Sequence, residues 1–190
     1  MTKVIVVNTS PRAKGNCDLV GQHMAKRLEA AGAEVRLVDF RTLDIGYCQG
    51  CDACKAKDRA WCVRKDDWST LIPAIDECDA LAILTPLYFG EITAQAKTVL
   101  DRIYPWFNPS KEGMSLAKRF GKKVAVLTTS GTSPIADGEA CAAKLAEPFG
   151  VAGFIESRVL AVNNVNEKGS AMNHAGYLAR VDELTDWMCR

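Results

Sequence analysis

The most constraining feature of this sequence is a regular alternation between short apolar runs of strand length and longer segments with helical periodicity. Residues 4–8 read Val-Ile-Val-Val-Asn, a continuous apolar run typical of a parallel strand that is buried on both faces. Over residues 16–32 the apolar side chains recur at helical spacing, with Asn16 as the predicted N-cap and Gly32 as the predicted stop. The pattern therefore predicts a strand followed by a helix.

The same alternation continues along the rest of the chain. The further predicted strands are 34–40, 79–85, 123–129 and 154–162, and the further predicted helices are 66–77, 90–104, 135–149 and 172–188. Strands that alternate with helices imply right-handed crossovers and a parallel sheet with helices on both faces. The sequence therefore predicts a doubly wound, five-stranded α/β fold.

Length and composition limit the organisation and the partners of this fold. The chain has 190 residues, a formal net charge of +1 and 48% hydrophobic residues, and no repeat or linker interrupts it. We expect one domain over 1–190, with a cysteine-rich insertion at about 44–66. A nearly neutral chain lacks the basic field that nucleic acid attracts, so neither nucleic acid nor a membrane is expected as a partner. No signal peptide or long apolar run is visible, which favours a cytoplasmic location.

The loop after the first predicted strand has the composition of an anion site. It reads Asn8-Thr-Ser-Pro-Arg-Ala-Lys-Gly-Asn16 and leads into a helix N-terminus, whose N–H groups and dipole favour a phosphate. Thr9, Ser10 and Asn16 offer further hydrogen bonds. The loop lacks both the G-x-G-x-x-G turn of dinucleotide sites and the G-x-x-x-x-G-K-[ST] loop of nucleotide triphosphate sites. It suits a terminal monophosphate such as that of FMN, although a loop that only links strand to helix is the alternative.

Two later loops end at the same edge of the predicted sheet. Residues 85–91 contain the aromatic pair Tyr88 and Phe89 followed by Gly90, and residues 128–133 read Thr-Thr-Ser-Gly-Thr-Ser. An isoalloxazine ring needs an apolar or aromatic surface and nearby backbone amides, which such loops can supply. A core or interface role remains the alternative for each aromatic residue taken singly.

These motifs together resemble those of a known family. The run Ser10-Pro-Arg-x-x-Gly-Asn16, the run Pro86-Leu-Tyr-Phe-Gly90 and the run Thr129-Ser-Gly131 are similar to the loops of the NAD(P)H-dependent FMN reductase group within the flavodoxin-like superfamily. Gln95, Lys97 and the pair Asp101-Arg102 belong to the same resemblance. It covers nearly the whole chain in the right order, and within the group the iron–sulfur flavoproteins are the most similar. It implies a flavodoxin-like sheet of strand order 2-1-3-4-5.

The resemblance also implies which residues hold FMN. Those expected around the phosphate are Ser10, Arg12, Asn16 and Cys17; those expected to flank the isoalloxazine are Pro86, Leu87, Tyr88, Phe89, Gly90, Thr129, Ser130 and Gly131. Cys17 departs from the family, whose members often have a hydroxyl residue there. In relatives the helix that follows the second loop meets another subunit near the flavin, so a homodimer or homotetramer is expected.

Four of the eight cysteines are clustered within fifteen positions, at Cys48, Cys51, Cys54 and Cys62. Four thiolates suit either a [4Fe–4S] cluster or a tetrahedral zinc ion. The compact run of three cysteines at intervals of three favours the cluster, and the resemblance to iron–sulfur flavoproteins implies it. The gap before Cys62 is longer than is usual in that family, and zinc or free thiols remain alternatives.

The sequence therefore predicts an FMN-dependent oxidoreductase that passes electrons between FMN, a [4Fe–4S] cluster and a protein or small-molecule acceptor, with NAD(P)H as the electron donor. A cluster-free NAD(P)H-dependent FMN or quinone reductase is one alternative. A non-catalytic redox sensor based on zinc or thiols is the other. No side chain is expected as a catalytic acid or base, because hydride chemistry belongs to the cofactor, and neither His23 nor His174 is part of a predicted triad.

Overall fold

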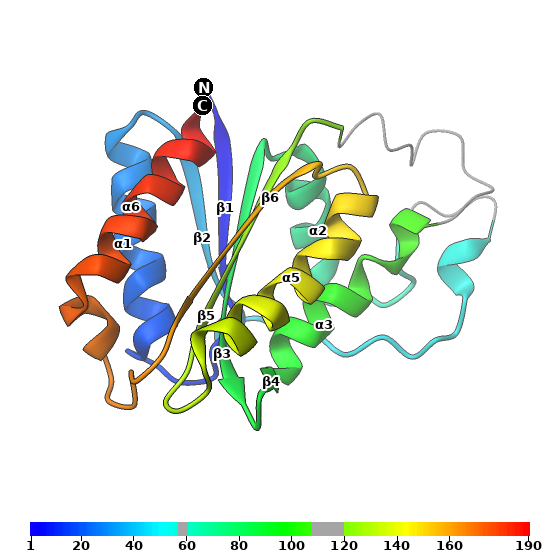
Figure 1. Cartoon of the computed structure of the whole chain (residues 1–190). Coiled ribbons are helices and arrows are strands. Elements are labelled where there is room, and N and C mark those ends of the chain that lie inside the picture. Colours follow the sequence, from blue (N-terminus) through cyan, green and yellow to red (C-terminus); the bar gives the residue numbers. More distant parts are fainter. Residues whose placement is uncertain (57–60, 108–119) are drawn as a thin grey trace.

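A parallel sheet lies at the centre of the computed structural model, which describes residues 1–56, 61–107 and 120–190 (Figure 1). Its strands are β1 (Lys3–Asn8), β2 (Glu34–Asp39), β3 (Ala80–Tyr88), β5 (Lys123–Thr129) and β6 (Glu156–Val162). They are ordered β2-β1-β3-β5-β6, and each neighbouring pair is parallel. This order is the predicted 2-1-3-4-5, because β5 and β6 are the fourth and fifth predicted strands. The doubly wound fold is confirmed.

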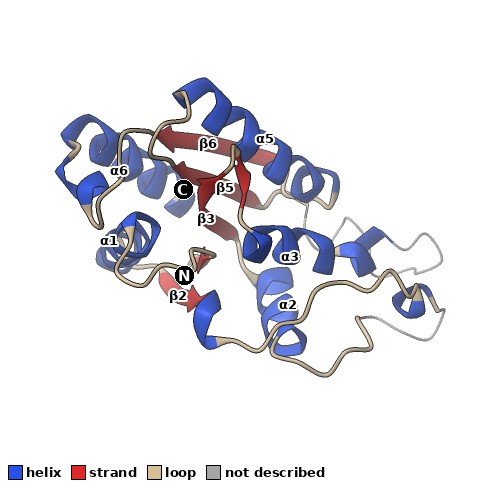
Figure 2. Ribbon diagram, turned by 90° about the horizontal axis from the view of Figure 1, so that it is seen from below, coloured by secondary structure: helices blue, strands red, loops and turns tan. Residues whose placement is uncertain are grey.

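Helices cover both faces of the sheet (Figure 2). One face carries α1 (Asn16–Ala30) and α6 (Ala175–Cys189); the other carries α2 (Trp68–Glu77), α3 (Ala94–Arg102) and α5 (Ile135–Val151). Single turns of 3-10 helix lie at Phe40–Thr42, Ala53–Lys55, Tyr104–Phe107 and Ser170–Asn173. Within the described residues, no helix is long and apolar enough to cross a membrane.

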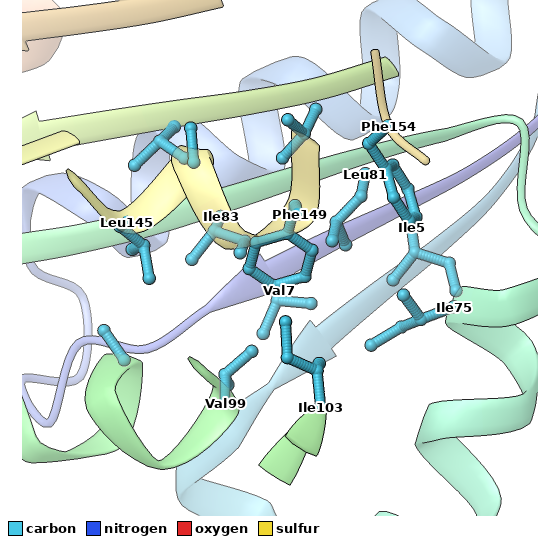
Figure 3. Close-up of a cluster of buried hydrophobic side chains, with 14 of the residues drawn as sticks. Ile5, Val7, Ile75, Leu81, Ile83, Val99, Ile103, Leu145, Phe149 and Phe154 are labelled. Atoms are coloured by element: carbon cyan, nitrogen blue, oxygen red, sulfur yellow. The ribbon is translucent and has the colours of Figure 1, made fainter. Parts of the chain in front are cut away.

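The apolar run of β1 explains how the sheet supports two cores. Ile5 and Val7 face the layer of α2, α3 and α5, where they join the cluster in Figure 3 that includes Phe149 and Phe154. The intervening Val4 and Val6 belong to the cluster under α1 and α6. Successive side chains of a strand point to opposite faces, so a strand covered on both sides needs apolar residues at every position.

A short hairpin that the sequence did not predict follows β3. Strand β4 (Glu91–Ile92) pairs with β3 in antiparallel fashion, with Leu87 opposite Ile92 and Tyr88 opposite Glu91, and makes the sheet six-stranded. The two turn residues, Phe89 and Gly90, have φ angles of 53° and 78°, the pattern of a type I′ turn. The predicted helix start at Gly90 is therefore wrong.

Four helix starts differ from the sequence prediction, and that of α2 moves from the predicted residue 66 to Trp68. Helix α3 begins at Ala94, and the N-cap is Thr93, whose Oγ1 accepts a hydrogen bond from the backbone N–H of Ala96. Helix α1 has Gly15 as its N-cap, so Asn16 is already its first helical residue. Helix α6 begins at Ala175 after a 3-10 turn that contains Met172. The shifts of α1 and α2 lie within the uncertainty of helix boundaries, whereas α3 and α6 begin three or four residues later than predicted.

Candidate functional site

The loop between β1 and α1 is held in one shape by short local hydrogen bonds. The backbone N–H of Ser10 donates to the side-chain oxygen of Asn8 at 3.0 Å, and the N–H of Arg12 donates to the Ser10 hydroxyl at 3.2 Å. The N–H of Gly15 then donates to the Arg12 carbonyl at 3.1 Å. The turn delivers the chain to the start of α1, where the first N–H groups of a helix have no partners within it. This is the geometry of an anion-binding helix N-terminus.

A cavity of ≈ 290 Å³, called here the first-loop cavity, opens at the carboxyl ends of β1, β3, β5 and β6. Its lining contains ten of the twelve residues that the sequence predicts as cofactor contacts: Ser10, Arg12, Asn16, Cys17, Pro86, Leu87, Tyr88, Thr129, Ser130 and Gly131. The others in the lining are Gly15, Thr132, Val165 and Asn166. Carboxyl ends of parallel strands on the two sides of a strand-order reversal form the usual ligand crevice of such sheets.

The Asn16 side chain is used to hold another loop. Its Nδ2 donates to the carbonyl oxygens of Val165 at 2.7 Å and Glu167 at 3.1 Å. Its Oδ1 accepts the N–H of Ala171 at 3.0 Å. These three bonds use both side-chain donor hydrogens and the carbonyl, so in this structure only the backbone N–H of Asn16 remains for an anion.

The loop after β6 forms a fourth wall of the cavity that sequence reasoning missed. Nη1 of Arg12 donates to the carbonyl of Asn166 at 3.0 Å. A Cβ at Gly131 would lie 1.9 Å from Oδ1 of Asn166, so Gly131 makes room for that side chain. The polar run Asn163-Asn-Val-Asn166 directly after a predicted strand was the available signal, because every strand end at this edge is a candidate ligand loop.

Cys17 lies at the floor of the cavity as a neutral thiol. Its Sγ is 3.3 Å from Oγ1 of Thr129, and both side chains are buried. Burial raises the pKa of Cys17 to about 12, although the contact with Thr129 acts in the opposite direction. Cys17 therefore adds no negative charge to the cavity.

Thr9 does not face the cavity. Its hydroxyl and its backbone N–H both donate to the carbonyl of Leu84 in β3, at 2.8 and 2.9 Å, and its side chain is fully buried. The carbonyl of Thr9 in turn accepts the hydroxyl of Thr93, the N-cap of α3. The prediction that Thr9 adds a ligand hydrogen bond is therefore not met in this structure, and the residue instead ties the first loop to α3.

The β3–β4 hairpin brings one of its two aromatic residues to the cavity. Tyr88 lines it and is 46% exposed, whereas Phe89, at the tip, is fully exposed and outside the lining. Gly90 is also outside the lining, and its carbonyl accepts a hydrogen bond from the thiol of Cys141 on α5 at 3.2 Å. The structure thus does not bring Phe89 and Gly90 together with the other predicted contacts.

The four clustered cysteines line a second cavity, called here the cysteine cavity, together with Arg64, Asp101, Arg102 and Tyr104. Cys54 is buried, Cys48 and Cys62 are partly buried, and Cys51 is exposed. Within the described residues, no three Cys, His, Asp or Glu side chains are close enough together to hold a single metal ion. Residues 57–60 of the predicted insertion, between Cys54 and Cys62, are outside the described part of the chain.

Two polar clusters connect the segment that carries the four clustered cysteines, residues 44–66 and called here the cysteine segment, to the rest of the domain. In the first, the buried carboxylate of Asp66 accepts two hydrogen bonds from Arg102, at 2.7 and 2.9 Å, and one from the backbone N–H of Gly46 at 3.2 Å. Burial alone would raise the pKa of Asp66, but these hydrogen bonds hold it below its ordinary value. In the second, Nζ of Lys55 lies 3.8 Å from the ring centroid of Tyr104 and donates to the carbonyl of Phe107 at 2.9 Å.

The two cavities lie at opposite ends of α3. Thr93, at the start of the helix, contacts the first loop, and Arg102, its last residue, contacts the cysteine segment. Figure 1 shows that segment, in cyan, reaching out beside α3 on the side away from α1 and α6. The two linings have no residue in common.

A doubly wound sheet with an anion-binding turn after its first strand and a ligand crevice at the strand ends places the chain in the flavodoxin-like class. Within this class it belongs to the NADPH-dependent FMN reductase family, whose model matches residues 2–166. The predicted resemblance is confirmed, and family membership supports FMN as the cofactor.

Comparisons with individual proteins agree with this family. An iron–sulfur flavoprotein of Archaeoglobus fulgidus is 34% identical over 130 residues, which cover 68% of this chain and 56% of that protein. A putative quinone reductase structure from Klebsiella pneumoniae has a TM-score of 0.73 at 19% identity, covering 98% of this chain and 84% of the other. An archaeal flavodoxin has a TM-score of 0.55 at 13% identity, covering 99% and 96%. The two structures support the fold alone.

Proposed function

We propose that this chain is an FMN-dependent oxidoreductase in which electrons pass between FMN, a [4Fe–4S] cluster and a small-molecule or protein acceptor. NAD(P)H is the proposed electron donor. The observation that carries the proposal is that Cys48, Cys51, Cys54 and Cys62 all line one cavity at the end of the helix whose other end contacts the proposed phosphate loop. The similarity to proteins named iron–sulfur flavoproteins supports the same function.

The chemistry of the first-loop cavity fits FMN. The Ser10 hydroxyl, the guanidinium of Arg12 and the free N–H groups at the start of α1 are the proposed phosphate donors. Pro86, Leu87 and Tyr88 supply an apolar wall suited to the isoalloxazine. When bound, FMN supplies the ability to exchange either one or two electrons. The chain's own task is to hold it in place and to limit the access of water.

The donor set of the cysteine cavity suits either a cluster or a single zinc ion. Around one zinc ion at Zn–S distances of 2.3 Å, tetrahedral geometry brings the sulfur atoms to roughly 3.8 Å from one another. In a [4Fe–4S] cluster each thiolate binds a different iron, so the four sulfur atoms are spread around a larger body. The cysteine cavity offers the four thiolates that either group needs, and the similarity to proteins named iron–sulfur flavoproteins favours the cluster.

Helix α3 lies between the two cavities that the proposed electron path would connect. Its nine residues span about 13 Å at the usual rise of an α-helix. The helix joins the two sites, because Thr93 is hydrogen-bonded to the first loop and Arg102 to Asp66 beside the cysteine cavity. This arrangement supports a functional link between the two sites.

Anaerobic purification followed by absorption spectroscopy and metal analysis tests the proposal. Flavin bands with a broad iron–sulfur shoulder, about four iron atoms per chain and reduction by NADH or NADPH are the expected results. Protein that binds no FMN, even after incubation with it, refutes the central part of the proposal. Zinc without flavin supports the sensor alternative instead.

A cluster-free reductase is the second candidate. It is favoured by the observation that no three metal-binding side chains converge within the described residues. Flavin without iron after anaerobic reconstitution, together with oxidation of NAD(P)H by quinones or free FMN, would establish this candidate.

We also propose that the protein assembles as a homodimer or homotetramer. Three aromatic side chains near the two cavities are exposed in the single chain, namely Tyr88, Phe89 and Tyr104. Exposed aromatic residues are enriched at subunit interfaces. Light scattering of the purified protein tests this proposal, and a monomer at micromolar concentration contradicts it.

A further inference from the structure

A buried arginine lies against the cysteine cavity. Arg102 ends α3, and its side chain is only 1% exposed. Its two terminal nitrogens donate to the two carboxylate oxygens of Asp66, at 2.7 and 2.9 Å, and Nη1 also donates to the carbonyl of Gly46. The backbone carbonyl of Arg102 accepts the indole N–H of Trp68 at 2.9 Å. The guanidinium is therefore fixed in position by the domain and not by the cysteines.

One donor of this fixed group is unused. Among the described residues, Nε of Arg102 is buried and has no hydrogen-bond partner. A buried donor without an acceptor is destabilising, and more so when the group is charged. Such a donor in a native protein needs an explanation, and a bound group that provides the acceptor is one.

The cavity itself indicates which acceptor is missing. Four cysteine side chains share the lining with Arg102. The lining also holds two carboxylates, Asp52 and Asp101, and Asp101 is paired with Lys97 one turn earlier. The four sulfur atoms are thus the more abundant acceptors in the lining.

The geometry points to Arg102 as a positioning residue whose Nε–H donates a hydrogen bond to a sulfur of the iron–sulfur cluster, either a cysteine thiolate or a sulfide. This inference rests on the proposed function, because it requires the cluster. Reduction adds one negative charge to the cluster, and a hydrogen bond to a sulfur stabilises the more negative state. Arg102 thus favours the reduced cluster, while Asp66 keeps the guanidinium neutralised and oriented.

The first test is the substitution Arg102→Lys, which keeps the positive charge but removes Nε–H. The midpoint potential of the cluster is measured by a redox titration followed by EPR. The expected result is an unchanged iron content and FMN affinity, and a tenfold lower equilibrium constant for one-electron reduction, equivalent to a fall of about 59 mV. Arg41→Lys is the matched control, because Arg41 is partly buried and, like Arg102, is paired with a carboxylate, that of Asp39, but does not line the cavity.

A second measurement does not depend on the stability of that variant. Pulsed EPR is applied to the reduced cluster in protein grown with ¹⁵N-arginine, in a background where Arg59 and Arg64 are replaced by lysine. Arg64 lines the cavity, and Arg59 lies outside the described residues. A ¹⁵N coupling to the cluster is expected from Arg102 and is expected to vanish when Arg102→Lys is added.

The outcomes separate this inference from the function on which it rests. Wild-type protein that takes up no iron overturns the proposed cluster and this role of Arg102 with it. Wild-type protein that carries the cluster but shows no ¹⁵N coupling, or an Arg102→Lys variant with an unchanged potential, overturns the role of Arg102 and leaves the proposed function intact.

Discussion

The first-loop cavity and the cysteine cavity differ in how their groups are held before any ligand binds. Around the first, strand ends and helix starts fix the chain, and hydrogen bonds such as those of Asn16 join loops from opposite ends of the sequence. Around the second, the described part of the segment contains one 3-10 turn, at Ala53–Lys55, and is tied down through Asp66 and Lys55. Strand ends and helix starts of the fold form the first site. The second site is held against the domain by side-chain interactions.

This difference implies that the two sites load independently. A preorganised site loses little conformational entropy when its ligand binds. A segment whose thiolates must first be brought together loses more. FMN is therefore expected to bind whether or not the cysteines hold iron. The cluster is expected to require the segment to be drawn together.

Removing a proposed cluster ligand gives the largest expected effect. Cys54→Ser removes the one buried thiol of the four, and we expect the iron content to fall from about four atoms per chain to less than about one. The Kd for FMN, measured by fluorescence titration, is expected to change by less than about twofold because the two cavities share no residue. Cys189→Ser, outside both cavity linings, is the control. If Cys54→Ser loses FMN together with iron, the two sites do not load independently.

Removing the side-chain hydrogen bonds of Asn16 gives the next largest effect. Asn16→Ala leaves two carbonyls and one N–H of the 163–171 loop without their partner, and we expect the free energy of unfolding of the FMN-free protein to fall by about 2–4 kcal/mol. Urea denaturation measures this, with the exposed Asn173→Ala as the control. An unchanged stability with a collapse of FMN affinity would mean that Asn16 contacts the cofactor directly, as the sequence predicts.

The proposed phosphate contact gives a moderate effect. Arg12→Ala removes a charge-assisted hydrogen bond worth about 1.5–3 kcal/mol, so the Kd for FMN is expected to rise by about 10- to 100-fold. The matched control is Lys14→Gly, which removes a nearby cation outside the cavity lining at a position with a φ of 55°. Equal losses in both variants would show that net charge, and not a specific contact, binds the phosphate.

The hairpin tip gives the smallest effect. Phe89 has a φ of 53°, a left-handed conformation that Asn tolerates better than Phe. Phe89→Asn is expected to stabilise the protein by up to about 1 kcal/mol in urea denaturation and to leave the Kd for FMN within about twofold. Tyr88→Ala, which alters the lining, is expected to weaken FMN binding. Weaker binding in the Phe89 variant would place that side chain against the flavin after all.

The elements predicted from the sequence were those whose signal is local. Residues 4–7 of β1 are apolar at every position because the strand is covered on both faces, and this pattern needs no knowledge of its neighbours. The hairpin after β3 was missed because its turn is Phe89-Gly90, whereas the strong sequence signal for a type I′ turn is Asn-Gly or Asp-Gly.

The roles of individual site residues were harder to predict, since they depend on distant partners. The carbonyl and N–H partners of Asn16 lie 149 to 155 positions further along the chain, so a residue suited to cap a helix or bind a phosphate was assigned those roles. Gly131 was expected to flank the isoalloxazine, but the space that a side chain at this position would take is filled by Asn166. The cysteine spacing was visible in the sequence, but the unused donor of Arg102 appears only when α3 is packed against the segment.

The bonds between Asn16 and the 163–171 loop also set an order of events during synthesis. A chain leaves the ribosome with its N-terminal part first, so the phosphate loop emerges long before the residues that complete its cavity. A nascent chain that ends before residue 163 has the turn and the start of α1 but not the wall that Val165 and Asn166 provide. Cofactor capture is therefore expected to wait for the last strand of the sheet, and a truncated translation product is expected to be released without flavin.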